Sequence, residues 1–170
     1  RDKIEKLVKS AAKANYNMLR VWGGGYYPSD DFYDLCDQYG IIVWQDLMFA
    51  CNIYDVTNEF KANVIEEIKD NIRRLRHHPS LCVVCGNNEI EQAFEEPWDD
   101  FKGHAEVLKE AYAELFEKTI PEEFKKIDTN AFDNTAEAVP DAAYYFSFDE
   151  ANGTDGIQPT AQDTAAGTLM

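Results

Sequence analysis

Three short apolar runs mark the first 128 residues of the chain, and a stretch with helical periodicity separates each run from the next. Apolar runs of this length, bounded by turn residues, indicate strands, and strands without polar alternation must be covered on both faces. The predicted strands are residues 17–22 (NMLRVW), 41–46 (IIVWQD) and 81–85 (LCVVC). We therefore expect an α/β fold with a parallel sheet and helical crossovers.

The stretches around these runs repeat apolar residues at intervals of three and four, which places one apolar stripe on each predicted helix. The stripes run over residues 4–12, 32–39, 60–75 and 107–116. Ser29 is placed to cap the second helix, and Gly40 is placed to end it. Pro79 stops the third helix after a basic last turn.

Periodicity alone allows either a barrel or an open doubly wound sheet. The glycine run at residues 22–26 (WGGGY) lacks the G-x-G-x-x-G spacing of the nucleotide-binding open sheet. We therefore favour the barrel.

The charge of the chain is acidic and unevenly spread. Asp and Glu outnumber Lys and Arg by 32 to 16, a formal net charge of −16. Every Lys and Arg lies at or before Lys126, whereas residues 129–170 hold seven acids and no base, and only residues 144–148 there have a strand-like pattern. We therefore predict an α/β domain over residues 1–128 and an acidic tail over residues 129–170.

The composition excludes several classes of partner. An acidic surface repels a phosphate backbone, so we expect no nucleic-acid partner. No apolar run reaches the length of about 18 residues that crosses a membrane, so we expect no membrane association. Four cysteines are too few for a disulfide scaffold of this length and favour a reducing compartment such as the cytoplasm.

Polar and aromatic residues follow directly on each predicted strand. Arg20–Gly23 ends the first strand, Trp44–Asp46 ends the second, and Gly86–Glu89 follows the third. In both α/β architectures, chemistry gathers at the carboxyl ends of the strands. Three such endings in succession predict one shared site.

Glu89 is the sharpest catalytic candidate, because it lies four residues past an apolar strand and beside Asn88. Partial desolvation at a barrel mouth favours the neutral form of a carboxyl, which is the form that acts as a general acid. The amide of Asn88 can donate a hydrogen bond to a sugar hydroxyl. The composition leaves equally open that Glu89 and Glu91 are solvated loop acids.

Three further residues each allow two interpretations. An aromatic ring at the rim of a site stacks on sugar rings, whereas a buried one belongs to the core. We favour the rim for Trp22, which precedes three glycines, and the core for Trp44. Asp46 either accepts hydrogen bonds from sugar hydroxyls or caps the loop that follows.

The cysteines and histidines of the strand region do not indicate a metal site. Cys82 and Cys85 have a redox-like spacing, but residues three apart on a strand face opposite sides, so we expect buried thiols. A zinc site would need a second cysteine pair. His77 and His78 precede the third strand, at the edge where stability resides, and we interpret them as helix-end cations or packing residues. We expect neither a metal nor a cofactor.

Five sequence blocks, in this order and spacing, resemble the β-mannosidase branch of family-two glycoside hydrolases. They are residues 18–25 (MLRVWGGG), 32–37 (FYDLCD), 43–51 (VWQDLMFAC), 76–80 (RHHPS) and 85–91 (CGNNEIE). The combination is highly specific, whereas the Asn-Glu pair alone also occurs in the β-galactosidase and β-glucuronidase branches.

The resemblance implies a partial TIM (β/α)8 barrel over residues 1–128, containing strands two to four with their helices. It implies a retaining enzyme for terminal non-reducing β-D-mannosyl residues, in which Glu89 matches the general acid/base and Asn88 matches the contact to the sugar 2-hydroxyl. Trp22 and Asp46 match substrate-contacting positions, and Trp98 matches an aromatic residue of the same mannose subsite. The implied partner is a β-mannoside or an oligosaccharide.

The chain departs from the family pattern after residue 128. The nucleophilic glutamate of the family comes from its seventh strand, so we expect the nucleophile outside this chain and no turnover by these residues alone. Residues 142–170 resemble the opening strands of a lectin-like β module, and a disordered acidic tail is the alternative. A non-catalytic carbohydrate-binding fragment and a β-galactosidase- or β-glucuronidase-like specificity also stay open.

Overall fold

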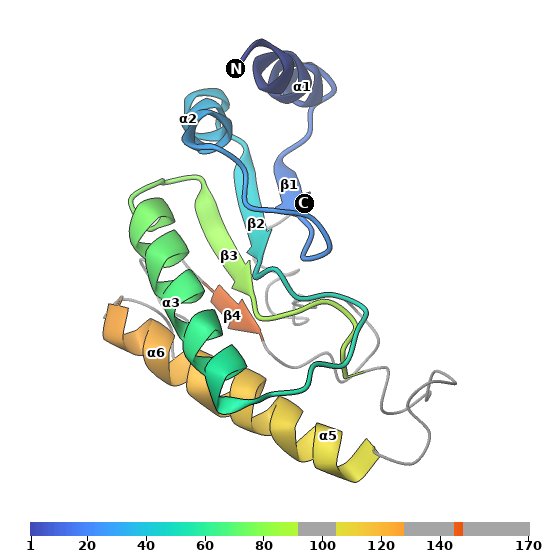
Figure 1. The fold of residues 1–170 in the computed structure, drawn as a ribbon. Coiled ribbons are helices and arrows are strands. Elements are labelled where there is room, and N and C mark those ends of the chain that lie inside the picture. Colours follow the sequence, from blue (N-terminus) through green and yellow to red (C-terminus); the bar gives the residue numbers. More distant parts are fainter. Residues whose placement is uncertain (92–104, 128–144, 148–170) are drawn as a thin grey trace, which may run out of the picture.

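The computed structural model describes residues 1–91, 105–127 and 145–147, which form a parallel sheet with helices packed along it (Figure 1). The strands are β1 (Met18–Val21), β2 (Ile42–Asp46), β3 (Leu81–Cys85) and β4 (Tyr145–Ser147). The helices are α1 (Asp2–Lys13), α2 (Asp30–Tyr39), α3 (Asn58–Leu75), α5 (Ala105–Tyr112) and α6 (Ile120–Ile127), and the π-helical segment η2 (Ala113–Thr119) joins the last two. The predicted α/β alternation is confirmed.

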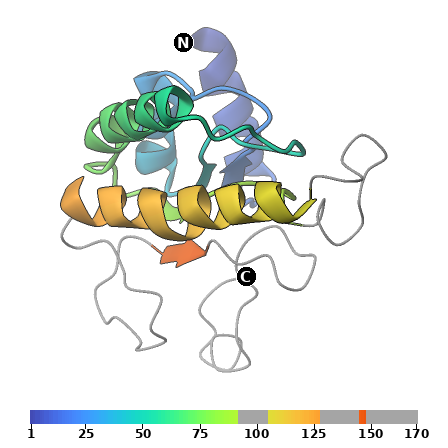
Figure 2. The same ribbon diagram turned by 60° about the horizontal axis from the view of Figure 1, so that its bottom comes forward.

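The sheet has the strand order β1-β2-β3-β4, and each pair is parallel. Parallel strands that follow chain order need crossovers of one hand, which place successive helices on the same face of the sheet. Figure 1 shows α2 and α3 on the same side of the strands, and Figure 2 shows α5, η2 and α6 running as one continuous helix. The carboxyl ends of β1, β2 and β3 therefore share one edge.

β4 comes from the segment that the charge pattern predicts to be an acidic tail. Its three residues lie within the strand-like stretch at residues 144–148 and pair with Val83, Val84 and Cys85. A short strand at this position satisfies backbone groups that would otherwise leave the edge of β3 unpaired. Residues 145–147 thus add a fourth strand to the sheet. The rest of residues 129–170 lies outside the described residues, so the domain boundary stays a prediction.

The helix ends agree with the predicted positions, with one correction. Gly40 ends α2 in the left-handed conformation, with φ of +65°. Ser29 occupies the N-cap position of α2, but its side chain makes no capping hydrogen bond, and its carbonyl instead accepts from the Phe32 N–H at 2.9 Å. Thr57, which the pattern did not single out, caps α3 by accepting from Phe60 N at 3.1 Å.

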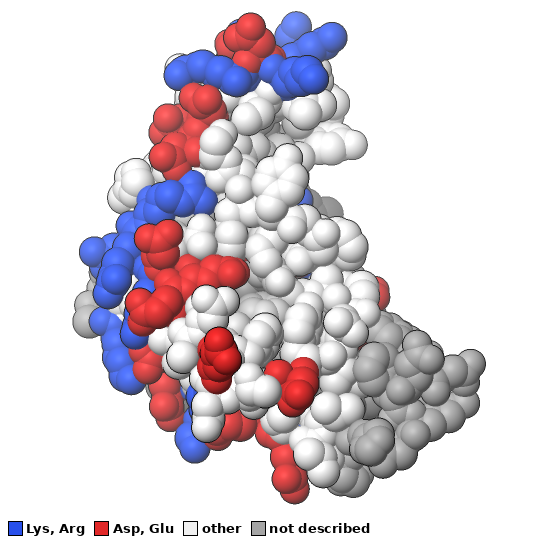
Figure 3. All heavy atoms as spheres, in the orientation of Figure 1, with Lys and Arg blue, Asp and Glu red and all other residues white. Residues whose placement is uncertain are grey.

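The core lies between the sheet and the helices. One stripe of α3 is buried against β2 and β3, and the π-helical segment adds a buried aromatic residue, Phe116. The buried stripe of α3 consists of Val64, Ile68, Ile72 and Leu75. In Figure 3 the charged side chains gather over α1 and along the helical flank, and much of the middle of this face is uncharged. On this face the charge is therefore carried mainly by the helices.

The cysteine expectation is confirmed in part. Cys85 is buried and Cys82 is half-buried, and neither forms a disulfide. Among the described helices, none is long and apolar enough to span a membrane.

Asp37 on α2 ties that helix to the start of β3. Its Oδ1 accepts from Ser80 N at 2.9 Å, and its Oδ2 lies 2.6 Å from Nδ1 of the buried His78. A carboxylate only accepts, so His78 Nδ1 donates. His78 is thus a packing residue with a polar partner, as one of the two interpretations of it predicts.

We expect Asp37→Asn to lower the free energy of unfolding by about 2 kcal/mol at pH 7, because it replaces a hydrogen-bonded carboxylate. Burial acts to raise the pKa of Asp37, but the hydrogen bonds from Ser80 and His78 outweigh burial and lower it. A carboxyl with a lowered pKa stabilises the folded state above its ordinary pKa of about 4 and loses that contribution as the pH falls through the folded value.

Urea unfolding of the protein at pH 7 and below pH 4 measures this effect. The difference between wild type and Asp37→Asn should shrink in acid. Asp70→Asn, which changes an exposed carboxylate on α3, is the control and should change stability by less than about 0.5 kcal/mol. A difference for Asp37→Asn that is the same at both pH values would contradict the role of this carboxylate.

Candidate active site

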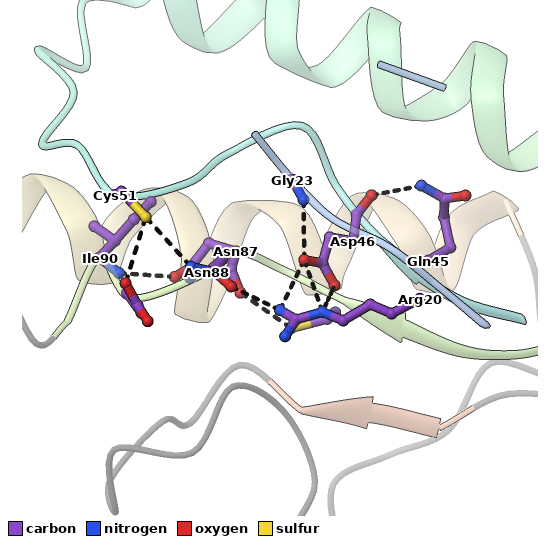
Figure 4. Close-up of polar contacts among 10 residues, drawn as sticks. Arg20, Gly23, Gln45, Asp46, Cys51, Asn87, Asn88 and Ile90 are labelled. Atoms are coloured by element: carbon purple, nitrogen blue, oxygen red, sulfur yellow. Dashed lines mark hydrogen bonds and ion pairs between the residues drawn. The ribbon is translucent and has the colours of Figure 1, made fainter. Parts of the chain in front are cut away.

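The ends of β1 and β2 are joined by an ion pair between Arg20 and Asp46. The guanidinium Nε lies 3.1 Å and 3.2 Å from the two carboxylate oxygens, and one terminal nitrogen (Nη2) lies 2.8 Å from Oδ2. Oδ2 also accepts from the backbone N–H of Gly23 at 3.0 Å. The Arg20 guanidinium covers the ring of Trp44, 4.9 Å from its centroid. Figure 4 shows Asp46 pointing toward both Arg20 and Gly23.

Arg20 also reaches the segment after β3. Its Nη2 donates to Oδ1 of Asn88 at 2.9 Å, so one guanidinium connects all three strand ends (Figure 4). Because Arg20 only donates, the Asn88 atom that faces it must be the carbonyl oxygen. The NH2 group of Asn88 therefore points the other way, toward Cys51 Sγ at 3.4 Å.

The chain continues to pair for a short distance beyond β2 and β3. Asn88 N donates to Phe49 O at 3.0 Å, and Cys51 N donates to Asn88 O at 2.9 Å. Directly after this bridge, Cys51 and Glu89 both take the left-handed conformation, with φ of +51° and +59°. Residues with a side chain rarely adopt this conformation, and it persists only where the surroundings enforce it.

The left-handed pair brings the thiol and the carboxylate together. Cys51 Sγ lies 3.4 Å from Glu89 Oε2, within the range of a thiol-to-carboxylate hydrogen bond. Glu89 itself is half-buried, whereas Asn88 is buried. The Cys51 thiol thus lies between the oriented Asn88 amide and the half-buried carboxylate of Glu89, at the carboxyl end of β3.

Asn87 supports the turn in which Glu89 lies. Its side chain is buried, its Oδ1 accepts from Ile90 N at 3.4 Å, and its Nδ2 donates to the Tyr112 hydroxyl at 3.3 Å. The bond from Ile90 N closes the turn that contains Glu89. The bond to Tyr112 connects this turn to the long helix formed by α5, η2 and α6.

Asp46 is completely buried, and its electrostatics differ from those of a solvated carboxyl. Burial raises the pKa of Asp46 above its ordinary value, while the Arg20 guanidinium and the Gly23 N–H oppose that rise by stabilising the carboxylate. Both carboxylate oxygens accept from Arg20, so Asp46 holds the strand ends together. By accepting from Gly23 N–H, Asp46 caps the loop after β1 and not the loop that follows β2, the strand to which Asp46 belongs.

The glycines after Trp22 allow close packing within the chain. A Cβ on Gly23 would lie 2.5 Å from the Phe49 carbonyl oxygen, and one on Gly24 would lie 2.1 Å from the Trp22 ring. Trp22 is 48% exposed, so its ring lies on Gly24 with one side toward solvent. Among the described residues, the hydrogen bonds of the Arg20 network do not extend to Trp22. Trp98 lies outside the described residues.

The sequence predicts that Arg20 lies at the site but gives it no role, and it does not single out Cys51 or Tyr112 as site residues. An available signal for Arg20 was its position inside an apolar run, because a charged side chain on a covered strand needs a partner of opposite charge. Asp46, at the end of the neighbouring strand, is that partner. Cys51 and Tyr112 carry no comparable signal, since their roles depend on backbone conformation.

One group among the described residues lies close enough together to share a metal ion, namely Asp34, Asp37 and His78. Asp34 and Asp37 lie on α2 and His78 precedes β3, so this group lies at the opposite edge of the sheet from Glu89. Because His78 already hydrogen-bonds Asp37, we assign it no metal.

Comparison with solved structures defines the class of protein to which this site belongs. A crystal structure of beta-D-mannosidase from Dictyoglomus thermophilum matches with a TM-score of 0.62 and 38% identity, over 75% of this chain and 15% of that one. Bacteroides uniformis beta-glucuronidase matches with a TM-score of 0.63 over the same shares, but at 19% identity it shows the fold alone. The sheet and its helices are thus a segment of the α/β fold of glycoside hydrolases.

Comparison with known sequences narrows the class. The chain is similar to beta-mannosidase of Capra hircus, with 45% identity over 120 residues, and to beta-mannosidase B of Emericella nidulans, with 35% identity over 138 residues. These matches cover 70% and 77% of the chain but only 14% and 16% of the relatives' lengths. No protein-family model matches the chain. The resemblance to the β-mannosidase branch of the glycoside hydrolases is therefore confirmed, and the chain corresponds to a part of such a protein.

Proposed function

We propose that this chain is part of the catalytic (β/α)8 barrel of a retaining β-mannosidase, with Glu89 as its general acid/base. The observation that carries the proposal is the position of Glu89. It lies at the carboxyl end of β3 in a left-handed conformation, beside an amide that Arg20 orients. Active sites of barrel enzymes lie at this end of the strands.

The strand order supports a barrel over an open doubly wound sheet. A doubly wound sheet reverses its strand order at a switch point, and its helices then lie on both faces. Here the four strands follow chain order without reversal. A barrel segment has this arrangement, with one helix after each strand on the outer face.

In the proposed reaction, Glu89 acts twice. As a carboxylic acid it gives its proton to the glycosidic oxygen while the bond from that oxygen to the anomeric carbon breaks. As a carboxylate it then takes a proton from the water that attacks the glycosyl-enzyme intermediate. The nucleophile of such a mechanism lies about 5 Å from the acid/base. We do not assign that role to Asp46, because both its oxygens accept from Arg20.

The remaining residues have binding roles in this proposal. Arg20 holds the carbonyl oxygen of Asn88, and one N–H of the Asn88 NH2 group faces Cys51 Sγ, so its second N–H is the donor for the sugar 2-hydroxyl. The exposed ring of Trp22 would stack on the sugar, and Trp98 would add a second aromatic surface. Asp46 acts on the substrate through Arg20 and Asn88.

We expect the complete protein that carries this segment to hydrolyse 4-nitrophenyl β-D-mannopyranoside with a kcat/KM at least about ten-fold above that for the matching β-galactoside and β-glucuronide. The configuration at C2 distinguishes mannose from both other sugars. Because the Asn88-Glu89 pair also occurs in the other two branches, this expected preference rests on the resemblance to the β-mannosidase branch and not on Asn88 alone. Initial rates on the three substrates measure the preference.

Two outcomes would overturn this proposal. Preferential hydrolysis of the glucuronide or galactoside would show a β-glucuronidase- or β-galactosidase-like specificity instead of the proposed β-mannosidase specificity. Binding of mannosides without hydrolysis, lost in Trp22→Ala but kept in Glu89→Gln, would favour a non-catalytic carbohydrate-binding protein.

A further inference from the structure

Tyr112 lies at the point where the long helix changes from α-helical to π-helical geometry. It is the last residue of α5, and η2 begins at the next residue. A π-helical turn holds one more residue than an α-helical turn, shifts the side chains around it, and recurs at functional sites. Here the side chain at this junction is buried and directed at the turn that carries Glu89.

The Tyr112 hydroxyl accepts from Asn87 Nδ2 at 3.3 Å, and Asn87 Oδ1 accepts from Ile90 N at 3.4 Å. These two bonds connect Tyr112 of the helix to the turn formed by residues 87–90. Glu89 lies within that turn. The Asn87 side chain is 1% exposed, so water does not replace a lost partner without a rearrangement.

The ring of Tyr112 makes a second connection to the site. Its centroid lies 5.1 Å from that of Phe116, which in turn lies 5.1 Å from that of Phe49 in an edge-to-face contact. The Phe49 carbonyl accepts from Asn88 N. Tyr112 therefore contacts the site through its hydroxyl on one side and through its ring on the other. A Phe in its place keeps the ring contact and removes only the hydroxyl.

We propose that Tyr112 is a positioning residue for Glu89, whose hydroxyl holds Asn87 and thereby keeps Glu89 in its left-handed conformation. This inference rests on the proposed role of Glu89 as acid/base. Without the Tyr112 hydroxyl, the turn relaxes toward an ordinary negative φ at Glu89. The carboxyl then moves away from the position that the leaving oxygen of a bound substrate would occupy.

The test compares Tyr112→Phe with wild type in the complete protein, on two substrates. For phenyl β-D-mannopyranoside, whose leaving group needs a proton, kcat/KM should fall about five- to ten-fold, the effect of one hydrogen bond. For 2,4-dinitrophenyl β-D-mannopyranoside, whose leaving group departs unprotonated, the fall should be less than about two-fold. The readout is the ratio of the kcat/KM values for the two substrates, because a general loss of folded protein lowers both values equally.

Tyr33→Phe is the matched control. It removes another buried hydroxyl, which donates to Gln45 Oε1 at 2.5 Å in the core. This variant should unfold at a lower temperature and leave the substrate ratio unchanged.

Asn87→Ala supplies a second variant on the same path. It should reproduce the substrate-dependent loss, and adding Tyr112→Phe to it should cause no further change in the ratio. An unchanged ratio in Tyr112→Phe, or a full additional loss in the double variant, would overturn the positioning role while leaving the acid/base role intact. Absence of β-mannoside hydrolysis by wild type would overturn both.

Discussion

Glu89→Gln in the complete protein should lower kcat/KM for phenyl β-D-mannopyranoside by about three orders of magnitude, since general acid catalysis contributes about 10²–10⁴-fold. Gln has nearly the shape of Glu but cannot give a proton to the leaving oxygen. For the 2,4-dinitrophenyl substrate, formation of the glycosyl-enzyme should slow less than about ten-fold, because that leaving group needs no proton. Pre-steady-state release of the phenol measures this step directly.

Glu91→Gln is the matched control for this prediction, because Glu91 lies two residues further along the same segment and is also half-buried. It should retain kcat/KM to within about two-fold on both substrates, as a change away from the reacting atoms does. Equal losses on good and poor leaving groups in Glu89→Gln would refute the acid role and leave Glu89 as a binding residue.

The second large effect concerns stability. Arg20→Met should lower the free energy of unfolding of the protein by about 3 kcal/mol, because it leaves the Asp46 carboxylate buried without its cation. The Asp46 side chain is 0% exposed and that of Arg20 is 26% exposed, so little water reaches the carboxylate in the folded protein. Urea unfolding at pH 7 measures the loss. The same variant should also slow catalysis, since the Asn88 carbonyl loses its donor.

Two comparisons show whether the unpaired charge is responsible. Lys61→Met removes a pair with Glu114 in which the side chains are 26% and 45% exposed, and it should cost less than about 1 kcal/mol. Asp46→Asn in the Arg20→Met background should restore part of the stability, because the buried position no longer holds a charge. If Arg20→Met costs no more than Lys61→Met, the pair of Arg20 and Asp46 does not hold the strand ends together.

The strands were the most predictable part of the fold. The run at residues 81–85 matches β3 residue for residue, and β2 begins one residue later than predicted. Strands covered on both faces are apolar along most of their length, so the run marks the strand. The position of β4 could not be derived in the same way, because a three-residue strand carries too little pattern to indicate its neighbour.

The long helix shows where periodicity stops being informative. Apolar spacing predicts a helix through residues 107–116, and the structure has one, but it changes to π-helical geometry at Ala113. One extra residue in a turn rotates the stripe that follows by about 100°, but a stretch of this length has too few apolar positions to reveal the change. The sequence therefore predicts the helix but not the junction that directs Tyr112 at Asn87.

The sequence predicted where the candidate site lies, but it did not predict the contacts within the site. Parallel strands end at one edge, so Arg20, Asp46 and Asn88 were expected near one another, and their hydrogen bonds join them. Whether Asn88 comes within hydrogen-bond distance of Arg20 depends on strand register, and the approach of Cys51 to Glu89 depends on two positive φ angles. Neither follows from residue type.

The paired left-handed residues have a consequence for how this segment can vary. Gly or Asn occupies such a conformation more readily than Cys or Glu, by about 1 kcal/mol per position for Gly. A library screened for folding alone should therefore drift toward Gly or Asn at positions 51 and 89, whereas one screened for activity should keep Glu at 89. The two screens, run on the same library, would separate what this turn needs in order to fold from what it needs in order to work.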